Sequence, residues 1–134
     1  MVIRNAGSRV TPDVLTDLAF IGYLAEVVFG VEGPLFEVAA IHHNECGTHF
    51  LADAQYRRAF AARIGVDEAA LVSGASADPE HTVRTDVELL RSSTLLPDRI
   101  TVSGHVYDVH TGLIGTVVPA APMHAHQASH AWMS

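Results

Sequence analysis

The 134-residue sequence contains no lysine and a single cysteine, Cys46. Its eight basic residues are all arginines, they are dispersed among fifteen acidic residues, and the formal net charge is -7. Proteins that bind the phosphate backbone of nucleic acids usually carry clustered basic residues, so this balance argues against nucleic-acid binding. A single cysteine excludes a disulfide within the chain and leaves a thiol that is reactive, metal-bound or buried.

Long apolar runs and an N-terminal targeting signal are missing as well. A membrane-spanning helix needs roughly 20 consecutive apolar residues, and no stretch of this chain reaches that length. Residues 1–7 resemble neither a signal peptide nor a transit peptide. With 49% hydrophobic and 17% charged residues, the composition is typical of a packed domain. We therefore expect a soluble, cytoplasmic protein with no membrane partner.

Local patterns predict that helices and strands alternate along the chain. Thr11 followed by Pro12 is typical of a helix start, and Asp78 followed by Pro79 repeats the pattern. Apolar residues at spacings of three and four continue the first helix to about residue 28. Helices are expected over 12–28, 52–64, 67–72 and 79–92, a strand end over 2–3, and strands over 36–41, 100–109 and 113–118.

This order of elements indicates an α/β fold with a mainly parallel sheet flanked by helices and an antiparallel C-terminal edge strand. Gly112 lies between the last two predicted strands, where a hairpin favours a residue that tolerates positive φ. The aromatic residues Tyr23, Phe29 and Phe60 are expected in the core. We predict a single domain over residues 1–118 and a disordered tail, rich in Pro, Ala and His, over 119–134.

His43 and Cys46 form a His-x-x-Cys motif just after the predicted strand 36–41. Open α/β sheets place their ligands at the carboxyl ends of strands. An imidazole nitrogen and a thiolate three residues apart on a loop can turn toward one zinc ion. On spacing alone, a buried thiol beside a hydrogen-bonded histidine is the more common arrangement. The motif therefore leaves a metal site and a structural role both open.

Several stretches, in this order, resemble the β-class carbonic anhydrases. They are V-I-R-N-A-G at 2–7, V-T-P-D-V at 10–14, H-H-N-E-C-G at 42–47, and G-H-V-Y-D-V at 104–109 followed by Thr111-Gly112. In that family a V-I-R-N-A-G strand end leads into a helix, and a later strand ends in H-x-x-C-G. The resemblance runs from residue 1 to about residue 118. It implies the family's α/β fold, a zinc cofactor, and reversible hydration of carbon dioxide to bicarbonate.

The resemblance makes His43 and Cys46 two of the family's three protein ligands for zinc, with His42 a neighbour and not a ligand. The third ligand in the family is the Cys of a C-x-D-x-R motif, on a strand that precedes V-I-R-N-A-G. That motif also supplies an Asp–Arg pair beside the metal. Because Cys46 is the only cysteine here, the motif is absent and the catalytic pair stays unassigned. We expect an N-terminally truncated or degenerate member with impaired activity, lacking a central strand between those that end at Ile3 and Ile41.

Three functions stay open at this point. The chain is a carbonic anhydrase whose present start omits the first strand, or a non-catalytic zinc-binding subunit that acts beside an intact partner, or a hydrolase of another small linear substrate such as carbon disulfide. The resemblance further implies a homodimer or a higher oligomer. Candidates to replace the third ligand are His49 and Glu45, and His124, His126 and His130 could chelate metal in the tail.

Overall fold

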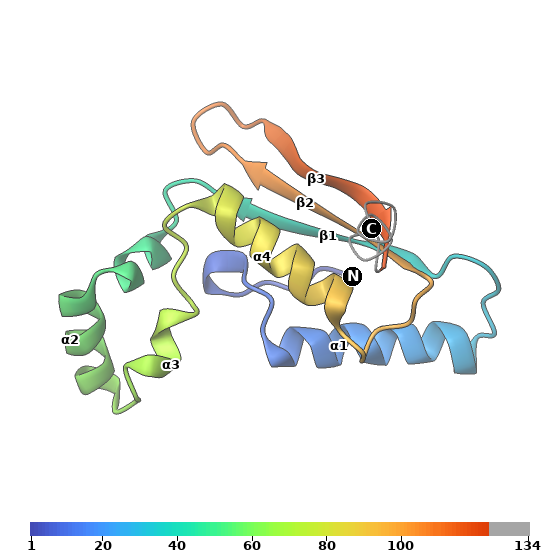
Figure 1. The fold of residues 1–134 in the computed structure, drawn as a ribbon, viewed down its shortest axis with the longest axis horizontal. Coiled ribbons are helices and arrows are strands. Elements are labelled where there is room, and N and C mark those ends of the chain that lie inside the picture. Colours follow the sequence, from blue (N-terminus) through green and yellow to red (C-terminus); the bar gives the residue numbers. More distant parts are fainter. Residues whose placement is uncertain (124–134) are drawn as a thin grey trace, which may run out of the picture.

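The computed structural model describes residues 1–123, so residues 124–134 of the predicted tail, with their three histidines, lie outside the described part. Its centre is a three-stranded sheet of order β1-β2-β3 (Figure 1). The strands are β1 (Phe36–His43), β2 (Ile100–Tyr107) and β3 (Ile114–Pro122). β1 is parallel to β2, and β3 runs antiparallel along β2. The predicted fold class, with its antiparallel C-terminal edge strand, is confirmed.

Helix α4 (Pro79–Ser92) packs across one face of this sheet (Figure 1) and supplies much of the core. It begins as predicted, because the Asp78 carboxylate accepts a hydrogen bond from the backbone N–H of His81. β2 approaches the helix closely at Gly104, where an added Cβ would lie 2.9 Å from a methyl carbon of Val87. The fully buried apolar side chains of helix and sheet are Val83, Val87, Leu90, Ile100 and Val102.

Helix α1 (Pro12–Tyr23) lies below the sheet and α4 in Figure 1 and continues into a π-helical turn, Leu24–Val28. The Thr11 hydroxyl accepts a hydrogen bond from the N–H of Val14, as the start pattern predicts. Leu18 faces the core. Tyr23 and Phe29, however, are 60% and 72% exposed, and Phe60 is exposed too, so their predicted core placement is wrong.

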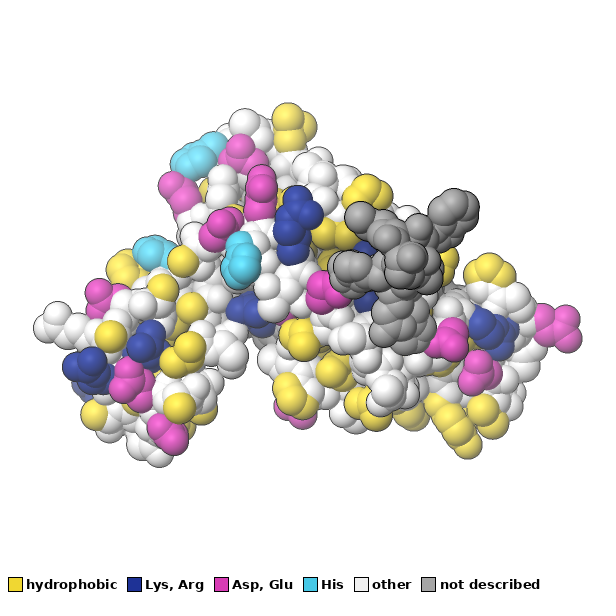
Figure 2. Space-filling model, viewed as in Figure 1, with side chains coloured by type: hydrophobic (Ala, Val, Ile, Leu, Met, Phe, Trp, Pro, Cys, Tyr) yellow, Lys and Arg dark blue, Asp and Glu magenta, His cyan; other side chains and the backbone are white. Residues whose placement is uncertain are grey.

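The helices between β1 and α4 project away from the sheet (Figure 1). A 3-10 turn (Gly47–Ala52) leads into α2 (Ala54–Ile64), which ends at Gly65 in the left-handed conformation, as predicted. The short α3 (Ala69–Val72) follows. None of the helices within residues 1–123 is long and apolar enough to cross a membrane. On the face drawn in Figure 2, arginine side chains lie beside acidic ones.

Several element ends differ from the predictions: β2 ends at Tyr107 and not at 109, and α2 and α3 each begin two residues later than expected. Residues 2–3 form no strand, because no neighbouring strand within residues 1–123 offers them backbone partners. β1 includes His42 and His43, which were expected in the following loop. β3 continues to Pro122, so residues 119–122 belong to a strand and not to a tail. Prolines at 119 and 122 are tolerated there because β3 is an edge strand.

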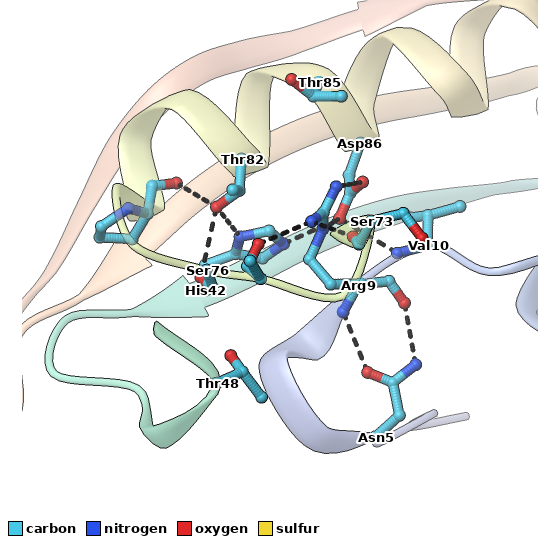
Figure 3. Close-up of polar contacts among 12 residues, drawn as sticks. Asn5, Arg9, Val10, His42, Thr48, Ser73, Ser76, Thr82, Thr85 and Asp86 are labelled. Atoms are coloured by element: carbon cyan, nitrogen blue, oxygen red, sulfur yellow. Dashed lines mark hydrogen bonds and ion pairs between the residues drawn. The ribbon is translucent and has the colours of Figure 1, made fainter. Parts of the chain in front are cut away.

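A buried polar network joins the N-terminal loop, β1 and α4 (Figure 3). The Asp86 carboxylate of α4 accepts two hydrogen bonds from the Arg9 guanidinium, at 2.9 and 3.0 Å, and one from the backbone N–H of Val10 at 3.0 Å. Nε2 of His42 lies 3.1 Å from the same carboxylate, and Nδ1 lies 2.8 Å from the Thr82 hydroxyl. The network therefore ties the end of β1 to α4.

Burial of Asp86 by itself raises the pKa of its carboxyl. The hydrogen bonds from His42 and Arg9, with the positive charge of Arg9, outweigh burial and hold that pKa below its ordinary value of 3.8. The carboxylate is thus charged at neutral pH, beside a guanidinium that is itself mostly buried. Arg9 also donates to the carbonyls of Ser73 and Ala75, which attaches the loop before α4 to the same network.

Replacing Asp86 by Asn is expected to lower the free energy of unfolding by about 3 kcal/mol, because it leaves a buried Arg9 charge without its counterion. Urea denaturation followed by circular dichroism measures the change. Glu88→Gln is the matched control, since Glu88 is exposed on the same helix, and a surface change of this kind stays within about 0.5 kcal/mol. Equal losses in the two variants would contradict the role of the network.

The same pair predicts how stability depends on pH. Because the native pKa of Asp86 is lowered, its contribution is complete above the unfolded-state value of about 4 and is lost as pH falls through the native pKa. The stability difference between the parent and Asp86→Asn should therefore shrink as pH falls below about 4 and through the lowered native pKa of Asp86. Urea titrations at several pH values test this, and a constant difference over that range would refute it.

Candidate functional site

The His-x-x-Cys motif lies at the carboxyl end of β1, as predicted. His43 is the last residue of the strand, and Cys46 immediately precedes the 3-10 turn Gly47–Ala52. Between them the chain reverses through Asn44 and Glu45, and Glu45 adopts a φ of 52°. Few residues other than glycine take this left-handed conformation. Glu45 is therefore held in a conformation that a glutamate does not favour.

The hydrogen bond of His43 defines which of its ring nitrogens is free. Nδ1 lies 2.8 Å from the backbone carbonyl oxygen of Asn44. A carbonyl only accepts, so Nδ1 carries the proton of the neutral ring and Nε2 keeps its lone pair. Metal-binding histidines commonly have one nitrogen hydrogen-bonded in this way and the other on the metal. His43 thus has the tautomer of an Nε2 ligand.

Cys46 is a free thiol that is 5% exposed. Its sulfur lies 3.0 Å from the hydroxyl oxygen of Thr48, two residues along the chain. Thr48 in turn packs against Gly7 of the N-terminal loop, where an added Cβ would lie 2.9 Å from the same hydroxyl oxygen. Gly7 has a φ of 80°. The thiol environment therefore depends on contact between the N-terminal loop and the turn after β1.

The donor chemistry of His43 and Cys46 suits zinc, which takes imidazole nitrogen and thiolate sulfur. Within residues 1–123, however, no three His, Cys, Asp or Glu side chains come together in a group that could hold a metal ion. His49 donates from Nδ1 to the Cys46 carbonyl at 2.7 Å and packs its ring on Phe50. Glu45 pairs with His110 at 2.9 Å on the surface. Neither His49 nor Glu45 supplies the third ligand in the described part.

A groove of about 890 Å³ follows the edge of β1 that does not pair with β2. Residues 36–41 and His43 form one wall, residues 1–5 form the other, and Leu18 and Leu90 contribute to its lining. The backbone N–H and C=O groups on such an edge are available to a further strand. The groove separates Ile3 from Ile41, which is where the sequence predicts that a central strand is lacking.

Sequence reasoning did not identify Asn44, Asp86 or Arg9 as residues that organise this site. Asp86 is 77 positions from Arg9 and 44 from His42 in the chain, so no local spacing connects them. The one local signal for Asn44 is its position inside the motif, directly after His43. The ring of His42 is buried and lies 3.1 Å from the Asp86 carboxylate in the core.

No protein-family model matches the sequence. Among curated proteins, β-carbonic anhydrase 1 of Mycobacterium tuberculosis is 28% identical over 118 residues, which is 88% of this chain and 67% of that protein. The corresponding protein of Mycobacterium bovis matches equally well. The chain therefore spans about two thirds of the length of these curated relatives.

Solved structures show the same relationship. A carbonic anhydrase from Streptococcus mutans superposes with a TM-score of 0.63 at 33% identity, covering 86% of this chain and 64% of that structure. A carbon disulfide hydrolase in its apo form superposes with a TM-score of 0.64 at 20% identity, covering 95% of this chain and 69% of that structure. At that lower identity the second likeness shows the fold alone.

Gly7→Ala is expected to raise the reactivity of the Cys46 thiol, because the added methyl group displaces the Thr48 hydroxyl that contacts the sulfur. Gly33→Ala is the matched control: Gly33 also has positive φ, and nothing lies within 4 Å of its added Cβ. Both variants should lose about 1 kcal/mol of stability through the left-handed backbone. Labelling with a thiol-reactive dye should separate them, and equal labelling rates would contradict the proposed contact.

Proposed function

We propose, since this chain belongs to the β-carbonic anhydrase family, that it provides part of a zinc site for the reversible hydration of carbon dioxide. His43 and Cys46 are the two ligands that it contributes. A strand seated in the groove along β1 supplies the third ligand and the Asp–Arg pair that the 134 residues lack. Without that strand, hydration activity is severely reduced.

The observation that carries this proposal is the state of the two donors at the end of β1. Nε2 of His43 has a free lone pair, because Nδ1 is bonded to the Asn44 carbonyl. The Cys46 sulfur follows three residues later and is shielded from solvent. Metal-binding histidines commonly have the second ring nitrogen bonded to such an acceptor, which supports His43 as a ligand.

The chemistry that a bound zinc ion supplies is ionisation of water near pH 7, which provides hydroxide for attack on carbon dioxide. The residues of this chain hold the donors for that ion. The turn keeps His43 in one tautomer, and Thr48 lies against the Cys46 sulfur. The buried network beneath α4 fixes the end of the strand from which His43 projects.

The groove supports the second half of the proposal. Catalytic zinc sites usually have three protein ligands, and two rarely hold the ion at useful affinity. The unpaired edge of β1 ends at His43, so an added strand would bring its side chains to the same end of the sheet. On this proposal, the groove beside β1 is where the strand with the third ligand is seated.

Carbon dioxide and bicarbonate are the proposed substrates, and a cytoplasmic homodimer or higher oligomer is the proposed form. Exposed apolar side chains support association with another subunit, because large exposed apolar patches commonly mark interfaces. Yellow side chains lie along the lower part of Figure 2. In α1 and the π-helical turn, the large apolar side chains that are more than half exposed are Phe20, Tyr23, Val27 and Val28, and Phe29, which follows the turn, is also exposed.

A non-catalytic zinc-binding subunit is the second candidate, and it is favoured because no third donor joins His43 and Cys46 within residues 1–123. Such a subunit would hold a metal weakly or share it with an intact partner. Hydrolysis of carbon disulfide is a third possibility on the same fold. The likeness to a carbon disulfide hydrolase gives no argument for that substrate, since it extends to the fold alone.

The proposal is tested by comparing the 134-residue chain with a version extended at its N-terminus by a strand that carries Cys-x-Asp-x-Arg. The matched control carries Ser-x-Asp-x-Arg. We expect one tightly bound zinc per chain and rapid hydration of carbon dioxide only in the cysteine-bearing extension. Cys46→Ser in that extended chain should abolish both, because it removes a second ligand. Metal analysis and stopped-flow hydration assays measure these outcomes.

Zinc binding without hydration in the extended chain would favour the non-catalytic subunit. Absence of zinc binding in the extended chain would refute the metal site. Hydration by the unextended chain at the rate of the extended one would refute the need for a third ligand.

A further inference from the structure

Asn44 makes hydrogen bonds through each of its polar groups, and together they attach the turn after β1 to the β2–β3 hairpin. Its backbone N–H donates to the Tyr107 carbonyl at 3.2 Å. Its side-chain Oδ1 accepts from the N–H of Val109 at 2.9 Å, and Nδ2 donates to the Asp108 carboxylate at 3.0 Å. Its backbone carbonyl, the remaining group, accepts from Nδ1 of His43.

We infer that Asn44 is the positioning residue of His43: by bonding to the hairpin through its side chain, it aims its carbonyl at Nδ1 and leaves Nε2 free. This inference rests on the proposed function, in which Nε2 is the metal-binding atom. It assigns to Asn44 a task that a residue with no hairpin contact could not perform. The side chain attaches Asn44 to the hairpin, and the backbone carbonyl makes the contact with His43.

Asp108 is a rigid partner for this contact. Its carboxylate accepts from the N–H of His110 at 2.9 Å, its own N–H donates to the Leu113 carbonyl, and its carbonyl accepts from Gly112. The N–H of His110 and the Asn44 amide lower the pKa of the Asp108 carboxyl, so it is charged at neutral pH. An ionised acceptor strengthens the hydrogen bond from Asn44.

The turn needs this external attachment because its own backbone is strained. Glu45 has a φ of 52°, a conformation that costs a residue with a side chain about 1 kcal/mol or more. Such conformations persist where surrounding contacts hold them in place. If the hairpin released Asn44, the turn could relax, and its carbonyl would no longer point at Nδ1. The histidine ring would then distribute its proton between both nitrogens.

The test reads the tautomer of His43 directly, by ¹⁵N NMR of the histidine rings in the metal-free 134-residue chain at about pH 8, where exposed histidines are neutral. His43→Gln identifies the signals of this ring. In the parent we expect Nδ1 to give a protonated and Nε2 an unprotonated nitrogen signal. In Asn44→Ala, both signals should move toward the values of a ring that exchanges between tautomers.

Exchanging the side chains of Asn44 and Asp108 should restore the parent tautomer of His43. Asn44→Asp alone removes the Nδ2 donor and places two carboxylates together, so it should release His43 as Asn44→Ala does. Adding Asp108→Asn returns one amide and one carboxylate to the contact, and the parent tautomer should reappear. Glu45→Gln is the matched control, since Glu45 lies in the same turn but pairs with His110 and not with His43. It should leave the ring unchanged.

Circular dichroism checks that each variant is folded. If Asn44→Ala unfolds, the comparison of Asn44→Asp with its rescue by Asp108→Asn still decides the question. A parent ring with the proton on Nε2, or an unchanged tautomer in a folded Asn44→Asp, would overturn the inference. The metal-free readout is separate from the proposed function, because a chain that never binds zinc can still hold His43 in one tautomer.

The metal provides a second readout in the chain extended with Cys-x-Asp-x-Arg. There, Asn44→Ala should weaken zinc affinity by about tenfold, the usual minimum for loss of a group that orients a ligand. Competition with a chelator measures this affinity, and Asp108→Asn combined with Asn44→Asp should restore it. The contrary outcome is that the double variant Asn44→Asp, Asp108→Asn regains the parent tautomer of His43 but binds zinc as weakly as Asn44→Asp alone. This would show that the orientation of His43 does not control zinc binding, and it would overturn the inference for the metal site.

Discussion

The buried charge of Asp86 is the interaction on which the end of β1 depends. The carboxylate of Asp86, on α4, is fully buried. It is stable there only because Arg9, the N–H of Val10 and the ring of His42 all bond to it. Successive strand residues point to opposite faces of a sheet. Anchoring His42 beneath α4 therefore turns His43 away from the core, toward the side where its ring meets the Asn44 carbonyl.

Two further attachments hold the turn that follows. On one side, Asn44 bonds to the β2–β3 hairpin. On the other, Thr48 lies between Gly7 of the N-terminal loop and the Cys46 sulfur. The two donors are thus organised by elements distant in the chain, before any metal is considered. Under the proposed function, His43 and Cys46 are two zinc ligands held in this way, and the groove beside β1 is the proposed place of the strand that carries a third.

The confirmed predictions of helix starts and turns rest on interactions between residues that are close in the sequence. Thr11 and Asp78 start helices because their side chains cap the first turn, and Gly65 and Gly112 take left-handed conformations that other residues avoid. Burial of a side chain, in contrast, depends on elements that are distant in the sequence. The aromatic ring of Tyr23 was expected in the core, yet it is 60% exposed. Composition alone does not say which side of a helix has a neighbour.

The sequence alone predicted the α/β class, the helix starts, the hairpin and the His-x-x-Cys motif. Each of these depends on local patterns of residues a few positions apart. The tertiary structure decided which histidine of the adjacent pair is buried, which ring nitrogen of the other is free, and that His49 and Glu45 bond elsewhere. Those outcomes depend on Asp86 and on the hairpin at Asp108, which lies 64 positions from Asn44 in the chain. Only folding brings such groups within hydrogen-bond distance, so no spacing in the sequence could reveal them.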